Sequence, residues 1–600
     1  MKRDISTSTM KRRRNSRGRQ LQVEQLETRA LLSGWTIGID AGAGAVRPSF
    51  RPTVDLAGNV YTAGMFSGTA DFNPSATAQF PLSSGSAEDA FVAKYSGVDG
   101  SLAWARQFSG VEASDAKAVA YDPSGVGSIV AVGAFKGSID FTGDGIADAT
   151  SAGDVDCFVV KLNATTGATL WFRTFGGTGW DRAVDVAVLG GEIYTAGHFS
   201  NTADLDPSPR TFTLSAAGTG KFRGPDAFVQ RLNSSGNFVT AWQMGGKSSD
   251  HAFSLQVDAE GVSVLGDFAE TADFQPGSGT LNKTSAGSVD VFLARYSLTG
   301  NPLWVQTIGG AGHDSASDWA IATTADAIYV SGAFAGKLDV DPGIKSHVLD
   351  SGDGFQDALM AKYSKTNGAF VWARSYGKLG THETAMRAAI DPVSGNVYFG
   401  GNFYGTLDFT PLISGDELVS AGDRDSLLVK LDPLGNFIKA WRFGGAGWDS
   451  VARPAGVVGN MVYVAGWLYP PGTGTGTADF PTGHTLTVAD GQDMYVMGLN
   501  DPPPTLAPTP SPLLAAAAPT RSVDQSLTVS QYEPIVTEAQ RRWQAAGVNT
   551  GVRRTDTEHD NLALVDQVFG QTVDHHTEGF LDTLLDDRLN SRRLWLKRRR

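Results

Sequence analysis

The chain has 600 residues, of which 72 are glycine and only 19% are charged, and its formal net charge is −14. Such a composition is typical of many short strands joined by turns rather than of long helices. Residues 1–33 carry about +6 and residues 501–600 about −1, so about −19 falls on the middle of the chain, which argues against a nucleic-acid partner. The single cysteine, Cys157, excludes an intrachain disulfide, and no apolar run reaches the ~18 residues of a transmembrane helix.

Residues 1–33 are a basic segment that we interpret as an export or targeting signal. The apolar stretch at its end, Ala30–Trp35, is too short for an ordinary secretory signal. Leu26–Ser33, which reads LETRALLS, resembles the Leu-Glu-x-Arg-x-Leu-Leu-Ser motif near the N-termini of planctomycete surface and exported proteins, although Thr28 stands where that family most often has proline. The resemblance implies an exported, extracellular or cell-surface protein. A disordered basic arm is the alternative.

Residues 34–500 contain a sevenfold repeat. Four independent markers return in the same order, and the tryptophan marker recurs at intervals of 62–71 residues. A glycine closes motifs such as YTAG, a corner aspartate opens motifs such as DFNP, and another aspartate opens motifs such as DAFVAKYS. The tryptophans are Trp35, Trp104, Trp171, Trp242, Trp304, Trp372 and Trp441. A regular period of this length indicates a repeat architecture.

Each repeat holds four short runs rich in Val, Phe, Tyr and Ile and bounded by Gly, Asn and Asp. The sequence therefore predicts an all-β fold, a seven-bladed β-propeller of four-stranded antiparallel blades. It also resembles the SBBP-type β-propeller repeats of bacterial exported proteins, in its Trp strand and in the motifs GG-x-G-x-D, GNVY-x-x-G, DF-x-P and D-x-F-x-x-K. The last repeat lacks a Trp strand, so we expect residues 34–39 to supply it and to close the ring.

The two faces of the predicted propeller differ in loop length. The turns inside a repeat, such as DLAG and NSSG, are tight, whereas the connections on the opposite face reach about twenty residues. We call this second face the long-loop face and expect any ligand site there, or in the mouth of the channel that it surrounds. The motif GGTGWD on this face looks like a calcium-binding nonapeptide, but its long spacing excludes the calcium β-roll.

A carboxylate recurs in the turn that leads into the first strand of six of the seven repeats, as Asp115, Asp181, Asp250, Asp314, Glu383 and Asp449. We expect these carboxylates to cap backbone N–H groups, with a cation-attracting ring as the alternative role. Two tryptophans and three histidines beside them, His382 among the latter, do not recur. An aromatic face beside a carboxylate suits sugar binding, although packing between blades is the alternative. The predicted ligand-binding residues are Trp180, Asp181, Asp250, His251, His313, Asp314, Glu383, Trp448 and Asp449.

One loop has the composition of a short calcium site. The stretch DFTGDGIAD places Asp140, Asp144 and Asp148 around two glycines, but it lacks the bidentate glutamate of an EF-hand. We therefore expect at most weak Ca²⁺ binding there and no other cofactor.

The C-terminal hundred residues divide in two. Residues 501–525 are predicted to be a Pro/Ala/Thr linker. Residues 526–600 are predicted to be a partly helical tail with a basic end, and the segment AQRRWQAAG within it resembles one found in planctomycete extracellular proteins. We expect this tail to bind a partner protein or the cell envelope.

The main functional prediction is a non-enzymatic binding or scaffold module that recognises a protein or a glycan through its long-loop face. The alternative is a carbohydrate-active lyase or hydrolase that uses carboxylates at the channel mouth. No His-x-x-x-His motif, cysteine cluster or Gly-x-Ser-x-Gly motif in a strand–turn–helix context favours other enzyme chemistry.

Overall fold

A computed structural model describes residues 34–502, except residues 43, 50, 76, 86, 219–223, 317–318, 342, 344, 353, 410–416, 450–451, 470–475 and 489–490. The described residues form an all-β protein without a helix, so none of them forms a helix that could span a membrane. The predictions for residues 1–33, for the tail 526–600 and for nearly all of the linker 501–525 lie outside this part.

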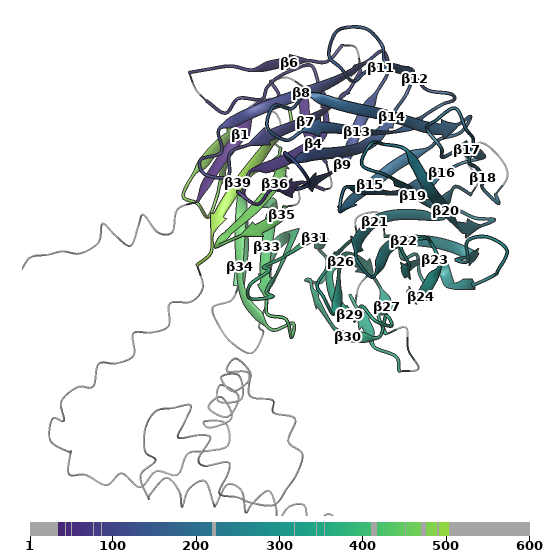
Figure 1. Cartoon of the computed structure of the whole chain (residues 1–600). Coiled ribbons are helices and arrows are strands. Elements are labelled where there is room, and N and C mark those ends of the chain that lie inside the picture. Colours follow the sequence, from purple (N-terminus) through teal and green to yellow (C-terminus); the bar gives the residue numbers. More distant parts are fainter. Residues whose placement is uncertain are drawn as a thin grey trace, which may run out of the picture. The chain divides into compact units, whose positions relative to one another are not determined.

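The fold is a β-propeller, in which antiparallel sheets are arranged around a common axis (Figure 1). We name the strands of a blade A to D from the axis outwards. Consecutive A strands lie against one another around the axis, and β35 lies against β3. The A strands are β2 (Ala45–Pro48) with β3 (Thr53–Val54), β9 (Ser114–Asp122), β15 (Arg182–Leu189), β21 (His251–Asp258), β25 (Ala320–Thr323), β31 (Thr384–Ile390) and β35 (Arg453–Val458).

The B and C strands form the middle of each blade. The B strands are β4 (Val60–Ser67), β10 (Ser128–Phe135), β16 (Glu192–Phe199), β22 (Gly261–Asp273), β26 (Ala327–Ala335), β32 (Val397–Asp408) and β36 (Met461–Leu468). The C strands are β7 (Asp89–Tyr95), β13 (Asp156–Asn163), β19 (Asp226–Leu232), β23 (Asn282–Tyr296), β29 (Gln356–Ser364), β33 (Glu417–Leu431) and β39 (Asp493–Asn500).

The D strands are outermost and more exposed. They are β1 (Trp35–Ile39), β8 (Leu102–Gly110), β14 (Thr169–Gly177), β20 (Phe238–Gly246), β24 (Pro302–Ile308), β30 (Phe370–Tyr376) and β34 (Phe437–Gly445). Every residue of β10 is buried, whereas β8 alternates between buried and exposed positions. The difference arises because both faces of an inner strand pack against neighbouring blades, which explains the continuous apolar runs in the sequence.

The hydrophobic core lies between blades. One cluster joins Tyr61 and Trp104 of the first blade to Ile129 and Phe158 of the second, and similar clusters follow around the ring. No blade buries its apolar faces alone, so each depends on its neighbours for stability.

The repeated tryptophans attach each blade to the next. The indole Nε1 of Trp104 donates a hydrogen bond to the carbonyl of Ala164 at 3.2 Å, in the C–D turn of the following blade. Its ring covers Gly167, where a Cβ would lie 2.6 Å from the ring. Trp35, Trp171, Trp304 and Trp372 make the equivalent bond to their next C–D turn. The tryptophan and the turn glycine therefore recur together along the chain, because they form one contact.

The B–C connections of several blades carry an outer hairpin. Asp204 sets one of these corners, because its Oδ1 accepts hydrogen bonds from the backbone N–H groups of Asp206 and Phe212 at 3.0 and 2.8 Å. The separate hairpins are β5 (Thr69–Asp71) with β6 (Pro81–Ser83), β11 (Ser138–Asp140) with β12 (Ala149–Thr150), β17 (Thr202–Asp204) with β18 (Thr213–Ser215), β27 (Lys337–Asp339) with β28 (Val348–Asp350), and β37 (Gly476–Asp479) with β38 (Thr485–Val488).

The ends of the described chain meet in one sheet. Strand β1 pairs antiparallel with β39, from Trp35 opposite Gly498 to Ile39 opposite Met494. This sheet has the order β1-β39-β36-β35, so the N-terminal strand supplies the D strand of the last blade, as the phase of the repeats predicts. The pairing covers the edge that β39 would otherwise expose.

Candidate functional site

The turn carboxylates of the long-loop face cap backbone N–H groups, as the sequence predicts. Asp181 accepts from Gly177 N–H at 2.7 Å and from Ser200 N–H at 3.1 Å. Asp250 accepts in the same way from Gly246 and Ala269. Equivalent bonds reach Asp314 from Gly310, Glu383 from Lys378 and Tyr404, and Asp449 from Gly445. Each carboxylate thereby fixes the connection between a D strand and the next A strand.

Each of four capping aspartates lies near the aspartate that opens a C strand. Burial, and secondarily Asp226, raises the pKa of Asp250 to about 8. Burial raises the pKa of Asp226 itself to about 7. Burial and the neighbouring Asp156 raise the pKa of Asp181 to about 7. The other two pairs are Asp290 with Asp314 and Asp425 with Asp449. Asp181, Asp226 and Asp250 therefore hold part of their protons at neutral pH.

Five of the six predicted turn carboxylates are at most 3% exposed, which goes against their alternative role as a cation-attracting ring. The prediction of capping is wrong for the sixth, Asp115. It lies within β9, and its carboxylate pairs with Lys117 and Arg182.

The predicted calcium loop is also held by backbone. Asp140 accepts hydrogen bonds from the N–H groups of Thr142, Gly143 and Gly145, at 2.7–2.9 Å. Asp148 accepts from Phe141 and Thr142, and Asp144 from Ile146. Within the described part of the chain, no group of three or more His, Cys, Asp or Glu side chains is arranged to hold a metal ion.

A cluster of non-repeating polar side chains lies where the A strands of the third to fifth blades begin. His251 on β21 is joined through Nδ1 to Oδ1 of Asp267 on β22 at 2.8 Å. The other oxygen of Asp267 accepts from the Ser315 hydroxyl at 2.8 Å. The His198 ring on β16 meets the His251 ring edge-on, with centroids 4.8 Å apart. We call His198, His251, Asp267 and Ser315 the histidine cluster.

The histidine cluster has the geometry of an acid–base centre. Asp267 engages Nδ1 of His251 and so fixes the orientation of the ring. Nε2 is then the nitrogen left for acid–base chemistry, and the His251 side chain is 23% exposed. His198 is fully enclosed, and burial, followed by the charges of His251 and Arg182, holds its pKa well below the ordinary value. His198 therefore stays neutral, whereas His251 has a carboxylate partner and access to solvent.

Two cations lie next to the histidine cluster. Arg182 on β15 is directly opposite His198 in the strand pairing. Its guanidinium lies 4.6 Å from the centre of the Trp180 ring. Arg182 and Lys117 share the carboxylate of Asp115, at 3.3 and 2.8 Å. Two cations thus lie beside one carboxylate at this part of the long-loop face.

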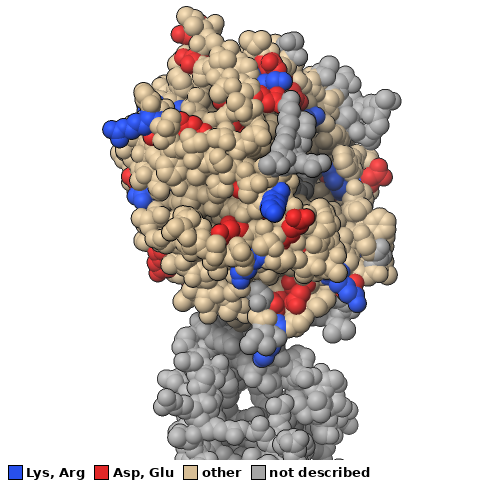
Figure 2. All heavy atoms as spheres, turned by 90° about the vertical axis from the view of Figure 1, so that its right-hand side faces the viewer, with Lys and Arg blue, Asp and Glu red and all other residues tan. Residues whose placement is uncertain are grey.

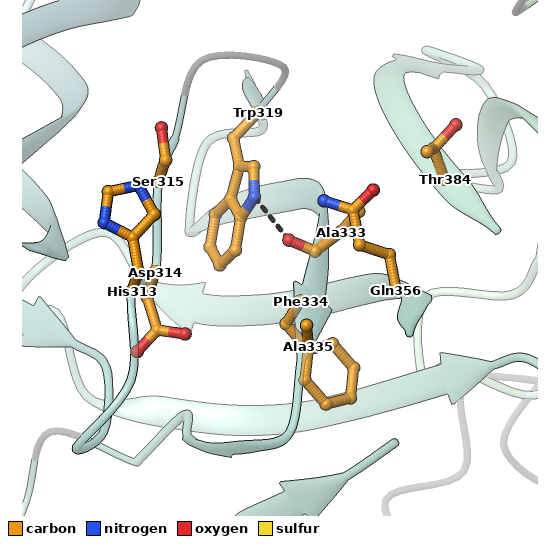
Figure 3. A pocket seen from close by; sticks show the side chains of 9 residues that line it. All are labelled: His313, Asp314, Ser315, Trp319, Ala333, Phe334, Ala335, Gln356 and Thr384. Carbon is orange, nitrogen blue, oxygen red and sulfur yellow. Dashed lines mark hydrogen bonds between the residues drawn. The ribbon is translucent and has the colours of Figure 1, made fainter. Parts of the chain in front are cut away.

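A pocket of about 110 Å³ adjoins the cluster on the side of Ser315. Its wall has polar groups from His313, Asp314 and Gln356 and the indole of Trp319 (Figure 3). The Trp319 indole donates a hydrogen bond to the Ala333 carbonyl at 3.0 Å, which holds the ring in place. An aromatic ring with hydroxyl, amide and carboxyl groups suits a polar ligand of the size of part of a sugar.

The structure brings some of the predicted ligand residues together and separates others. Trp180 is 37% exposed and lies 5.5 Å from the His198 ring, so it borders the histidine cluster. His313 and Asp314 line the pocket beside Ser315. Trp448 is 42% exposed but belongs to another blade, where it stacks on Arg424 at 3.8 Å and bonds to the Tyr404 hydroxyl.

Sequence reasoning missed His198, Asp267, Ser315, Arg182 and Lys117. A signal for two of them exists in the repeats. His198 and Asp267 both follow the recurring glycine of the B strand, at a position where the other repeats have Met65, Ala134, Ala333, Asn402 and Trp467. The residue type at this position differs from repeat to repeat, although the glycine before it does not. Such variation indicates that the residue serves function rather than the fold.

The outer surface shows no basic stripe on the face drawn in Figure 2. Acidic and basic side chains are interspersed there among many uncharged residues, and neither kind gathers into a large patch (Figure 2). This face offers no electrostatic footprint for nucleic acid.

Comparisons with known proteins identify no family for the chain. No family model and no curated protein matches it. Solved structures with similar folds include quinohemoprotein alcohol dehydrogenases of Pseudomonas putida (9% identity, 85% of this chain, 81% of that chain, TM-score 0.33) and Comamonas testosteroni (12%, 85%, 80%, 0.33). A europium-containing methanol dehydrogenase is another (11%, 78%, 82%, 0.32).

These comparisons correct two predictions. The similar structures are named as alcohol and methanol dehydrogenases, which goes against the prediction of a non-enzymatic binding module. They are named as quinohemoproteins or as europium-containing, which also goes against the expectation of no cofactor beyond weak calcium. Identities of 9–12% carry no substrate or cofactor over to this protein.

Proposed function

We propose that the chain is a seven-bladed propeller enzyme that cleaves an acidic polysaccharide by β-elimination at the histidine cluster. The observation that carries the proposal is the His251–Asp267 pair at 2.8 Å, beside the cations Arg182 and Lys117. An oriented, partly exposed imidazole next to two cations combines a base with a site for a substrate carboxylate.

In this reaction His251 Nε2 removes the proton from the carbon next to a uronate carboxylate. The electron pair of that C–H bond forms a carbon–carbon double bond, and the C–O bond to the leaving sugar breaks. The leaving oxygen takes a proton from water. Asp267 stabilises the imidazolium that forms, as a carboxylate partner does for a general base.

The cations favour this step by stabilising the negative charge that develops on the substrate carboxylate. Arg182 is suited to the task because its planar guanidinium can bind a carboxylate through two hydrogen bonds. Arg182 covers one face of the Trp180 ring. The ring is 37% exposed and gives a sugar ring a surface for packing.

Hydrolysis by two carboxylates is the less suitable chemistry for this face. Its buried carboxylates, such as Asp181 and Asp250, are engaged with backbone N–H groups. A glycosidase needs two carboxyl groups that flank the scissile bond, and the turn carboxylates are too buried to do so.

The proposal includes export. A polymeric substrate is met outside the cell, and the support is the basic segment that ends in Leu26–Ser33 together with the likeness of the repeats to SBBP-type propellers. Fractionation of cells that produce the full chain tests this part, and a protein confined to the cytoplasm contradicts it.

The test of the activity is a screen of uronate-containing polysaccharides with the full-length protein, followed through the ultraviolet absorbance of the unsaturated product. His251→Asn is expected to lower the rate at least 100-fold, since a general base contributes about 10²–10⁴-fold. His347→Asn is the matched control, because His347 packs on Phe370 at the outer hairpin. New reducing ends without ultraviolet absorbance would show hydrolysis and overturn the elimination.

A further inference from the structure

The fifth blade differs from its neighbours where its A strand begins on the long-loop face. Strands β15 and β21 begin at the residue directly after their turn carboxylate, whereas β25 begins at Ala320 although the turn carboxylate is Asp314. The Trp319 indole, just before β25, is buried and lies against Gly332 of β26. A large aromatic ring therefore forms one wall of the pocket of about 110 Å³ in this blade.

The pocket lies where a capping bond of the neighbouring blades is missing. In the fourth blade, Asp250 accepts its second hydrogen bond from Ala269 N–H, the residue after the recurring phenylalanine of the B strand. The third blade has the equivalent bond. In the fifth blade the equivalent residue is Ala335, which lines the pocket, and Oδ1 of Asp314 has no hydrogen-bond partner among the described residues. No such bond therefore joins the turn to β26 here, and the pocket lies between them.

The pocket has an apolar floor and a polar rim. Trp319 and Phe334 are each 2% exposed and form the floor. His313 and Gln356 are exposed at the rim, and Figure 3 shows them on opposite sides of the Trp319 indole. A ligand group can therefore contact an aromatic surface and, at the same time, a side-chain amide that both donates and accepts hydrogen bonds.

The charges around the pocket favour a neutral group. No lysine or arginine is among its lining residues. Burial raises the pKa of Asp314 to about 6, so most of this carboxyl group is ionised at neutral pH. A substrate carboxylate would meet this negative charge with no lining cation to offset it, so the pocket suits an uncharged substituent.

The pocket lies directly beside the proposed base. Ser315 lines the pocket and donates a hydrogen bond to Asp267, the partner of His251. Arg182, His251 and Ser315 belong to the third, fourth and fifth blades in turn. A polymer that places a uronate carboxylate at Arg182 and the adjacent C–H bond at His251 therefore extends a neighbouring sugar towards the pocket.

We propose that this pocket holds the acetamido group of an N-acetylhexosamine next to the cleaved uronate, so that the substrate is a polymer in which uronate and N-acetylhexosamine alternate. The acetamido methyl packs on the Trp319 ring, and the acetamido N–H and C=O pair with the side-chain amide of Gln356. This inference rests on the proposed function and names the class of its substrate.

The experiment compares heparosan, which alternates glucuronate with N-acetylglucosamine, with the same polymer after chemical N-deacetylation. The full-length protein is used, and the readout is the ultraviolet absorbance of the unsaturated product. We expect kcat/KM to be at least tenfold higher for heparosan. Gln356→Ala should remove most of this preference, mainly by raising KM, because the contact is made before the reaction as well as during it. Equal kcat/KM for the two polymers, or a preference that Gln356→Ala keeps in full, would overturn the proposal.

The matched control is Gln306→Ala. Gln306 lies on the outer strand β24 and donates to the Asn367 carbonyl at 3.2 Å, and it does not line the pocket. This variant should keep the preference of the unchanged protein. Gln356 is exposed at the start of β29, so its truncation should not affect folding, which thermal melting verifies.

A binding measurement separates this proposal from the proposed function. Saturation-transfer NMR with the methyl glycoside of N-acetylglucosamine should show transfer to the acetamido methyl, lost in Gln356→Ala and kept in Gln306→Ala. If no uronate polymer gives an unsaturated product, the elimination is contradicted and the NMR measurement alone decides on the pocket. Transfer that Gln356→Ala abolishes then supports the acetamido pocket, and no transfer in the unchanged protein overturns it.

Discussion

At the scale of single residues, the paired carboxyl groups make stability depend on pH. The pKa of Asp250 rises from an ordinary 3.8 to about 8 and that of Asp226 to about 7, chiefly through burial. An unfolded chain releases these protons at lower pH, so the folded state binds more protons between about pH 4 and pH 8. Raising the pH through this window therefore lowers the free energy of unfolding. The loss is about 1.4 kcal/mol for each tenfold difference in proton affinity between the folded and the unfolded state.

The first prediction is that Asp226→Asn weakens this pH dependence. Oδ1 of Asp226 is buried without a hydrogen-bond partner, while Oδ2 accepts from Ala217 and Gln243. Asparagine places a neutral amide nitrogen at the Oδ1 position and removes the negative charge of Asp226 that repels Asp250. Melting temperatures measured from pH 5 to pH 8.5 should fall less in the variant than in the unchanged protein. Asp144→Asn, at an exposed loop position, is the control, and equal slopes in all three proteins would contradict the account.

The second prediction concerns the contact between a tryptophan and a turn glycine. Gly167 has φ +69°, and a Cβ there would lie 2.6 Å from the Trp104 ring. Gly143 has φ +78° but nothing near its Cβ position. Gly143→Ala should cost about 1 kcal/mol for the left-handed backbone, whereas Gly167→Ala should cost about 3 kcal/mol because overpacking adds to it. Urea unfolding measures both, and equal costs would show that the tryptophan contact contributes nothing.

At the scale of elements, strand β1 holds the ring closed through its pairing with β39. The Trp35 indole also donates to the Gly97 carbonyl at 3.0 Å and so connects the last blade to the first. Loss of this strand removes a buried tryptophan, worth about 3–5 kcal/mol, and exposes an edge of the sheet.

The third prediction is that deletion of residues 1–40 unfolds or aggregates the propeller. Deletion of residues 1–33 is the matched control, since it keeps β1 and should melt at the temperature of the full chain. Calorimetry and light scattering distinguish the outcomes. Cooperative melting of the shorter protein at the unchanged temperature would mean that the ring does not depend on β1.

At the scale of the whole molecule, the fold follows from the sequence far more directly than the site does. The contact of Trp104 with Gly167 recurs in six places around the ring, so one chain repeats the evidence several times. The glycine before His198 recurs for a similar reason, since a Cβ at Gly197 would lie 1.9 Å from the Arg182 carbonyl oxygen.

The site could be predicted only in part, because its residues occur once and come from different blades. His251 and Trp180 stood out as aromatic residues beside turn carboxylates. Asp267 lies opposite His251 in the pairing of β21 with β22, but Ser315 joins them only after the fourth and fifth blades pack together.

The measurement that tests the central claim most directly is a double-mutant cycle on His251 and Asp267, with the unsaturated product from a uronate polysaccharide as the readout. If the pair acts as one acid–base unit, Asp267→Asn and the double variant should lose about as much kcat/KM as His251→Asn alone, since residues of one unit are not additive. Losses that add up in the double variant, or no unsaturated product from the unchanged protein with any uronate polysaccharide, would contradict the account.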